Sequence, residues 1–122
     1  MVDYNPYKST VTDQTLVKFL QEDMKFDLEC IPGIGPAAKK VLHEKNINNS
    51  FQLVAMFLNF KENAGDDCVA HCTKFFHFLN DAGIKGNRHS IVKSIAEKVA
   101  ISFPNLYVEN QFSNLEPMDS SV

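Results

Sequence analysis

The sequence has no tryptophan, no excess of positive charge and no long apolar run. Its 122 residues carry a formal net charge of −3 at pH 7. Proteins that bind nucleic acids mainly by charge show a clear basic excess. The acidic balance therefore predicts that any nucleic-acid binding is weak per site and sensitive to salt or to oligomerisation. The missing apolar run, for its part, predicts no membrane insertion, since a bilayer span needs about 20 apolar residues.

Cysteine is also scarce, with three residues, and no signal-type segment is recognisable at the N-terminus. These features predict an intracellular protein with reduced thiols. The ten phenylalanines and the hydrophobic content of 44% favour one packed globular domain over a disordered chain.

No strand-like alternation of apolar and polar residues persists along the chain, whereas apolar residues three and four apart are frequent. They predict an all-α protein, a compact bundle of about five helices in a SAM-like arrangement that includes a helix-hairpin-helix. The expected helical segments, with limits set by capping and breaking residues, are 12–24, the hairpin unit 28–45, 50–60, 67–81 and 88–103. We expect a flexible N-terminal arm over 1–11, the helical domain over 12–104 and an acidic, disordered tail over 105–122.

The segment 28–42 is the most informative part of the chain. Gly33 and Gly35 are expected to supply the open backbone angles of a tight hairpin. Ile34 between them can turn inward as an apolar plug. Pro36 suits the first turn of a following helix, where its missing N–H would have no partner anyway.

The backbone N–H groups around Gly33, Gly35 and Ala37 would point outward from a helix N-terminus, which favours binding of anions such as phosphate oxygens. Lys39 and Lys40 follow one turn into that helix. The pattern therefore predicts a grip on the nucleic-acid backbone. A plain interhelical turn is the alternative interpretation.

A second glycine-rich turn, 82–87, again joins two helices with apolar faces. It has the form of a degenerate second hairpin that would place Lys85, Asn87 and Arg88 near the same duplex. A simple helix-to-helix turn explains the pattern equally well.

Several short motifs occur in the order found in one family. They are Gly33-Ile-Gly35, Lys39-Lys40, Leu42, Met56-Phe-Leu58, the run Phe75 to Leu79, Gly83 and Phe103. In this order and spacing the chain resembles the barrier-to-autointegration factor family, small helical chromatin proteins that bridge DNA duplexes as dimers. The resemblance covers residues 15–103.

The resemblance implies non-catalytic, sequence-independent binding and bridging of double-stranded DNA. It implies a homodimer, LEM-domain proteins of the nuclear envelope as partners, and a nuclear location, with the cytoplasm as the alternative compartment. Together with the hairpin pattern, it makes the expected DNA-binding residues Gly33, Ile34, Gly35, Pro36, Ala37, Lys39, Lys40, Lys85, Gly86, Asn87 and Arg88.

The chain also departs from this family. Lys39 stands where the family has a small residue between the hairpin helices, so Ala38 would have to take that role. The basic N-terminal residue that contacts DNA has no clear counterpart, and Lys8 or Lys18 would substitute for it. The loop 63–67 is longer than in the family.

A zinc site and a core cluster compete for Cys68, His71 and Cys72, which share one helix face. Because the two cysteines continue the apolar stripe of Phe75 and Leu79, and no second ligand pair appears, we favour core packing and expect neither a metal nor another cofactor.

Two other functions compete with DNA bridging. A repair lyase would need a lysine of lowered pKa, for which Lys39, Lys40 or Lys74 could serve. A protein-interaction module could instead dock a partner on the aromatic helix at 75–78. We expect a binding protein without catalytic residues.

Overall fold

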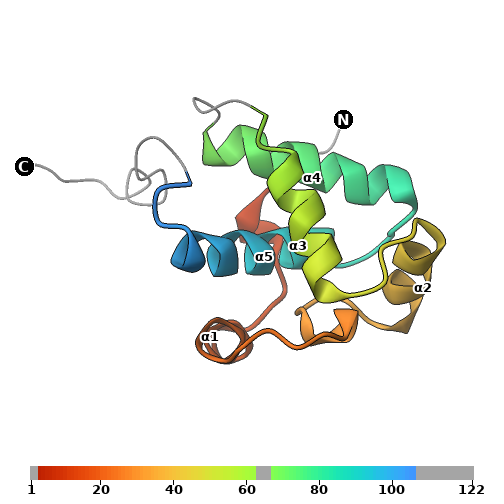
Figure 1. Ribbon diagram of the computed structural model, residues 1–122, viewed down its shortest axis with the longest axis horizontal. Helices are drawn as coiled ribbons and strands as arrows, with labels where there is room; N and C mark the ends of the chain where they lie inside the picture. Colours follow the sequence, from red (N-terminus) through yellow and green to blue (C-terminus); the bar gives the residue numbers. More distant parts are fainter. Residues whose placement is uncertain (1–2, 63–66, 107–122) are drawn as a thin grey trace, which may run out of the picture.

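The computed structural model describes residues 3–62 and 67–106. The elements run in the order η1 (Pro6–Lys8), α1 (Asp13–Gln21), η2 (Leu28–Cys30), α2 (Pro36–Glu44), α3 (Ser50–Asn59), α4 (Cys68–Ala82) and α5 (Arg88–Ser102), where η marks a 3₁₀ helix (Figure 1). The described residues form five α-helices and no strand, so the expected all-α bundle is confirmed. The expected tail lies, from residue 107 onward, outside the described residues.

Local capping sets most helix ends. The side chains of Thr12, Asn49 and Asp67 accept hydrogen bonds from the N–H groups of the first turns of α1, α3 and α4. Helix α4 ends at Gly83, whose φ of +107° is the left-handed conformation typical of a helix end. Helix α1 stops at Gln21, earlier than the expected end near residue 24.

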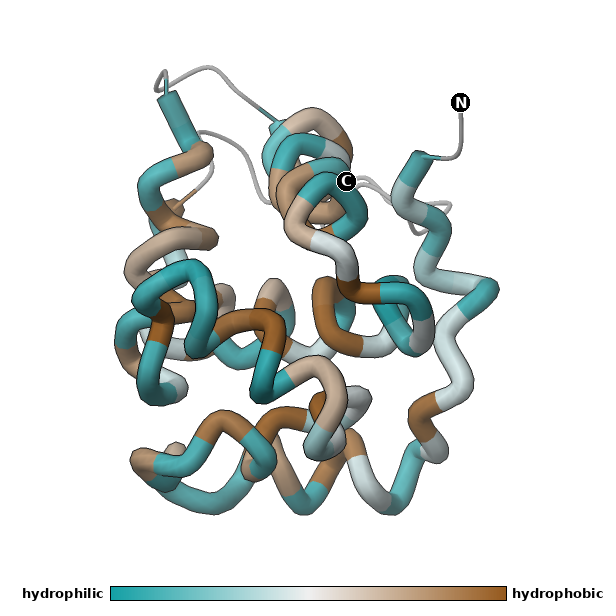
Figure 2. Tube along the Cα trace, turned by 90° about the vertical axis from the view of Figure 1, so that its right-hand side faces the viewer, coloured by the Kyte–Doolittle hydropathy of each residue, from teal (hydrophilic) through white to brown (hydrophobic). Residues whose placement is uncertain are grey.

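Helix α5 is the centre of the domain, because it packs against α1, α3, α4 and η1. Its residues Ser90, Ile91, Val92, Ser94, Ile95, Ala96 and Val99 are buried. In Figure 2 the helices change between hydrophobic and hydrophilic colours along the chain, as amphipathic helices around a shared core do. Within the described ranges, no helix has the length and apolar content needed to cross a membrane.

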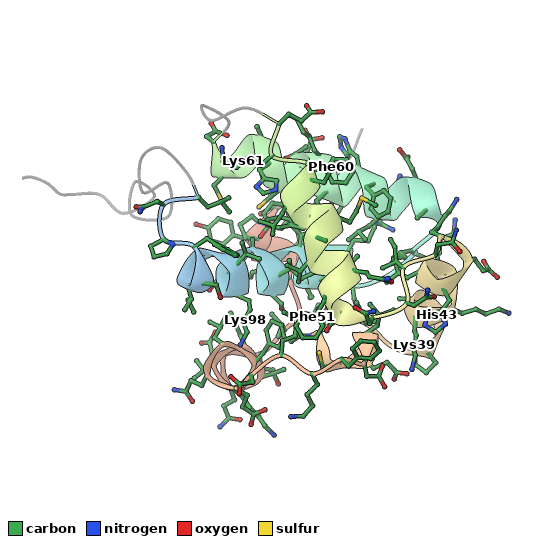
Figure 3. The ribbon with its side chains drawn as sticks, viewed as in Figure 1. Lys39, His43, Phe51, Phe60, Lys61 and Lys98 are labelled. Carbon is green, nitrogen blue, oxygen red and sulfur yellow. The ribbon has the colours of Figure 1, made fainter. Side chains whose placement is uncertain are left out.

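Lys98 connects α5 to α1. Its Nζ donates hydrogen bonds to the main-chain oxygens of Phe19 (2.8 Å), Leu20 (3.3 Å) and Glu22 at the end of α1. Figure 3 shows this side chain directed from α5 toward α1. A cation at a helix C-terminus satisfies carbonyl groups that lack intrahelical partners, so this lysine holds α1 on the core.

The N-terminal segment differs from the flexible arm expected over 1–11. The ring of Tyr4 packs against Phe76, with 6.5 Å between centroids. Ser9 Oγ and the Thr10 N–H both donate hydrogen bonds to the buried Ser90 Oγ, at 3.1 and 2.9 Å. These contacts, which composition alone does not predict, bind the segment to α4 and α5 from residue 3 onward.

Candidate nucleic-acid interface

The first hairpin has the architecture expected from its sequence. The short helix before it is the 3₁₀ helix η2, and the Ile34 N–H donates to the Ile31 carbonyl oxygen at 3.0 Å to close the turn. Ile34 is buried, as expected of an apolar plug. Pro36 opens α2, and Gly35 is the residue before it.

The two glycines of this hairpin have different roles. Gly33 has a φ of +100°, and a Cβ there would lie 2.9 Å from Cγ1 of Ile91 and 3.2 Å from the main-chain oxygen of Asn87. Gly35, in contrast, has a φ of −106°, which any residue adopts, so the expectation of an open backbone angle there is wrong. A Cβ at Gly35 would meet nothing within 4 Å. Gly33 is therefore required for packing, whereas Gly35 leaves the start of α2 uncovered.

The second glycine-rich turn leads into α5 through Asn87, whose φ is +61°. Arg88 is engaged inside this turn, because its Nη1 donates to the carbonyl oxygens of Ile84 and Lys85, each at 2.8 Å. Its guanidinium also lies over the ring of Phe76, 5.4 Å from the centroid. Arg88, expected to contact DNA, thus shapes the turn through its Nη1.

The structure brings the two turns together. A hollow of about 280 Å³ is lined on one side by the first hairpin and α2, and on the other by the 83–87 turn. Its lining residues are Gly33, Gly35, Pro36, Ala37, Ala38, Val41, Gly83, Ile84, Lys85, Gly86 and Asn87. In Figure 1, α2 and the connection from α4 to α5 lie on the same side of the molecule. We call these residues the two-turn surface.

Two helices begin at the two-turn surface, α2 at Pro36 and α5 at Arg88. The first N–H groups of any helix have no partner within it, and the helix dipole makes this end electropositive. The arrangement can therefore bind two neighbouring anionic groups through the main chain, which a single helix start cannot do.

The lysines near this surface are not equivalent. Lys39 is paired with Asp27 (3.1 Å) and Glu29 (3.6 Å) beside the hairpin. Its hydrogen bond to Asp27 raises the pKa of the Lys39 ammonium, and these carboxylates offset its charge. Figure 3 shows Lys39 on α2 near His43. Lys85 lines the two-turn surface, whereas Lys40 lines a neighbouring hollow that also includes Glu29 and Glu44. Both lysines are exposed, and neither forms an ion pair within the described residues.

Tertiary packing brings Lys8 close to His89, which lies just after the second turn. Segment 3–12 places Lys8 near His89 in the first turn of α5, and Asn5 N–H donates to His89 Nδ1 at 3.1 Å. Burial, then the charges of Lys8 and Arg88, lower the pKa of the His89 imidazole. Lys8, one of two lysines considered as a substitute for the missing basic residue, thus lies near the first turn of α5. Lys18 lines a separate hollow beside α1.

The cysteine cluster lies in the core, as favoured from the sequence. Cys68 and Cys72 are buried with 3.9 Å between their sulfur atoms. His71 stacks on Phe57 at 4.0 Å, and its Nε2 lies 2.6 Å from the Phe57 carbonyl oxygen, to which it can donate. Within 3–62 and 67–106, no three His, Cys, Asp or Glu side chains are grouped as metal ligands.

Four of the residues considered for the competing functions lie in surroundings that do not favour those functions. Phe75 and Phe76 are buried, so they do not form the surface that a docking helix would need. The raised pKa of Lys39 is the opposite of what a Schiff-base lysine requires. Lys74 is ion-paired with Glu62 at 2.9 Å.

Comparison of the chain with family models, with curated proteins and with solved structures finds no match.

Proposed function

We propose that the protein binds double-stranded DNA through the two-turn surface, without catalysis and without reading sequence. The main-chain N–H groups at the starts of α2 and α5 would hold phosphate oxygens. Lys40 and Lys85 would add unpaired positive charge at the edges. Phosphate contacts carry no base information, so the proposed binding is independent of sequence.

The observation that carries this proposal is the meeting of the two turns in one hollow. The turns are about 50 residues apart in the chain, and each has by itself an ordinary structural explanation. Two helix starts side by side, with Gly35 and Gly86 presenting no side chain and open space beyond, suit a ligand with repeated phosphates.

The resemblance to the barrier-to-autointegration factor family extends the proposal beyond single-duplex binding. By that resemblance, a homodimer would present two such surfaces and bridge two duplexes, in the nucleus or also in the cytoplasm. LEM-domain proteins would be its partners there. The acidic overall charge makes each single site weak, and two such sites on one dimer would gain affinity by acting together.

A salt titration of duplex binding tests the proposal. We expect two to three phosphate contacts per surface, so the slope of log K against log salt should be about −2 to −3. Fluorescence anisotropy with labelled short duplexes of different sequence measures this slope and the sequence preference together. A flat salt dependence, or strong preference for one sequence, contradicts the proposal.

A further inference from the structure

An apolar groove lies away from the two-turn surface, among α3, the C-terminal half of α5 and the segment after α1. Three aromatic side chains at this face are strongly exposed, Phe26 by 66%, Phe51 by 52% and Phe103 by 51%. Phe26 and Phe51 contact each other with 6.4 Å between ring centroids. Exposed aromatic residues grouped in this way are typical of an interaction site.

The groove is a hollow of about 460 Å³ lined by Asp23, Met24, Phe51, Val54, Ala55, Leu58, Lys98, Val99, Ser102 and Phe103. Most of these side chains are apolar. A second hollow of about 410 Å³ shares Leu58, Ser102 and Phe103 with it and extends to Leu106. The two hollows therefore form one continuous surface that ends where the described chain ends.

The course of the chain indicates what covers this surface. The Leu106 N–H donates to the Phe103 carbonyl oxygen at 2.9 Å, and Leu106 packs, partly buried, against the core. The residues that follow, 107–122, thus begin at the edge of the groove. A ligand tethered at this point has an effective concentration of about millimolar, far above that of a separate molecule.

The sequence of 107–122 suits such a groove. Val108, Phe112 and Leu115 are spaced by four and three residues, a spacing that would place them on one face if the segment were helical. As a helix, the stretch from Val108 to Leu115 would span about 10 Å, which matches the groove side of α3 from Phe51 to Leu58 at about 10 Å. Composition alone predicts disorder for this segment, and the groove supplies the apolar partner that it lacks.

We propose that the groove is an intramolecular docking site for residues 107–118, which bind with Val108, Phe112 and Leu115 facing α3 and α5. This segment holds two of the acidic residues of the chain, Glu109 and Glu116, and none of its lysines or arginines. Docked there, it lies at the end of α5 opposite Arg88, about 20 Å along the helix from the two-turn surface.

Nuclear magnetic resonance of the full chain tests the docking. Phe112→Asp should shift the amide signals of Phe51, Val54 and Leu58, because the apolar contact is lost. Ser113→Asp is the matched control, since it adds the same charge one residue away, off the apolar face. Equal spectra of the two variants at these residues overturn the proposal.

Proteolysis gives the reciprocal test from the groove side. Phe51 is exposed, so Phe51→Asp should leave the fold intact. If the tail is docked about nine-tenths of the time in the wild type, loss of docking should increase cleavage within 107–118 by about tenfold, because cleavage follows the population of the undocked form. Val17→Asp, on the exposed face of α1, is the control. Sedimentation should show the same oligomeric state for the wild type and Phe51→Asp. Unchanged cleavage overturns the proposal. Dissociation of a dimer by Phe51→Asp also overturns it, because the groove would then bind a second copy of the chain.

Discussion

Gly35→Glu is the sharpest test of the two-turn surface, because the structure separates its effect on binding from its effect on folding. The backbone at Gly35 has an ordinary φ, and a Cβ there meets nothing within 4 Å. The residue precedes α2 and makes no side-chain cap, so its replacement costs at most about 1 kcal/mol of helix stability. The helical circular dichroism of the variant should match that of the wild type.

The effect on binding follows from Coulomb's law. A carboxylate about 4 Å from a phosphate is repelled by about 1 kcal/mol in water and about 4 kcal/mol near a protein surface. An intermediate value of about 2 kcal/mol corresponds to a loss of affinity of about 30-fold. Gly86→Glu on the second turn should act in the same direction, since a Cβ there is also unobstructed.

Fluorescence anisotropy with a labelled duplex at low salt measures this loss. Ile101→Glu is the matched control, because Ile101 is exposed on α5 about 20 Å along the helix from Arg88 and adds the same charge. If Gly35→Glu and Ile101→Glu bind duplex equally, with unchanged helicity, the hairpin does not contact phosphate and the reasoning fails.

Two further predictions concern the supports of this surface. Gly33→Ala should lower the free energy of unfolding by about 1–3 kcal/mol in urea denaturation, because its Cβ would press on Ile91 at a strained φ; stability equal to that of the wild type would contradict the packing. The lowered pKa of His89 means that its neutral form is favoured in the folded state, where Nδ1 accepts from Asn5 N–H. The contribution of neutral His89 to stability should be complete above about pH 6.5 and should fall as the pH drops through the lowered pKa. The melting temperature should therefore decrease more on acidification in the wild type than in His89→Asn.

Features that depend on near neighbours in the chain were predictable. The caps Thr12, Asn49 and Asp67 and the left-handed Gly83 define helix ends through hydrogen bonds within a few residues. The inward position of Ile34 follows equally from the apolar pattern of the hairpin. Such interactions are local, so propensity and spacing reveal them.

Features that depend on distant partners were not predictable. The expected flexible arm is bound through Ser90, which lies some 80 residues away in the chain. The charge of Lys39 is offset by Asp27 and Glu29 across the hairpin, which a count of lysines does not show. Arg88 is a further case, because its Nη1 is occupied by carbonyl groups of its own turn.

By itself, the sequence determined that this chain is an all-α bundle with two glycine-rich turns, because helix periodicity and capping depend on residues that are close together in the chain. Tertiary structure decided that the two turns share one hollow and that, of the four glycines lining it, Gly33 is the one at which neighbouring atoms exclude a side chain. The reason is steric: the atoms that exclude a side chain at Gly33 belong to Asn87 and Ile91, and folding alone brings them within 3.2 Å of its missing Cβ.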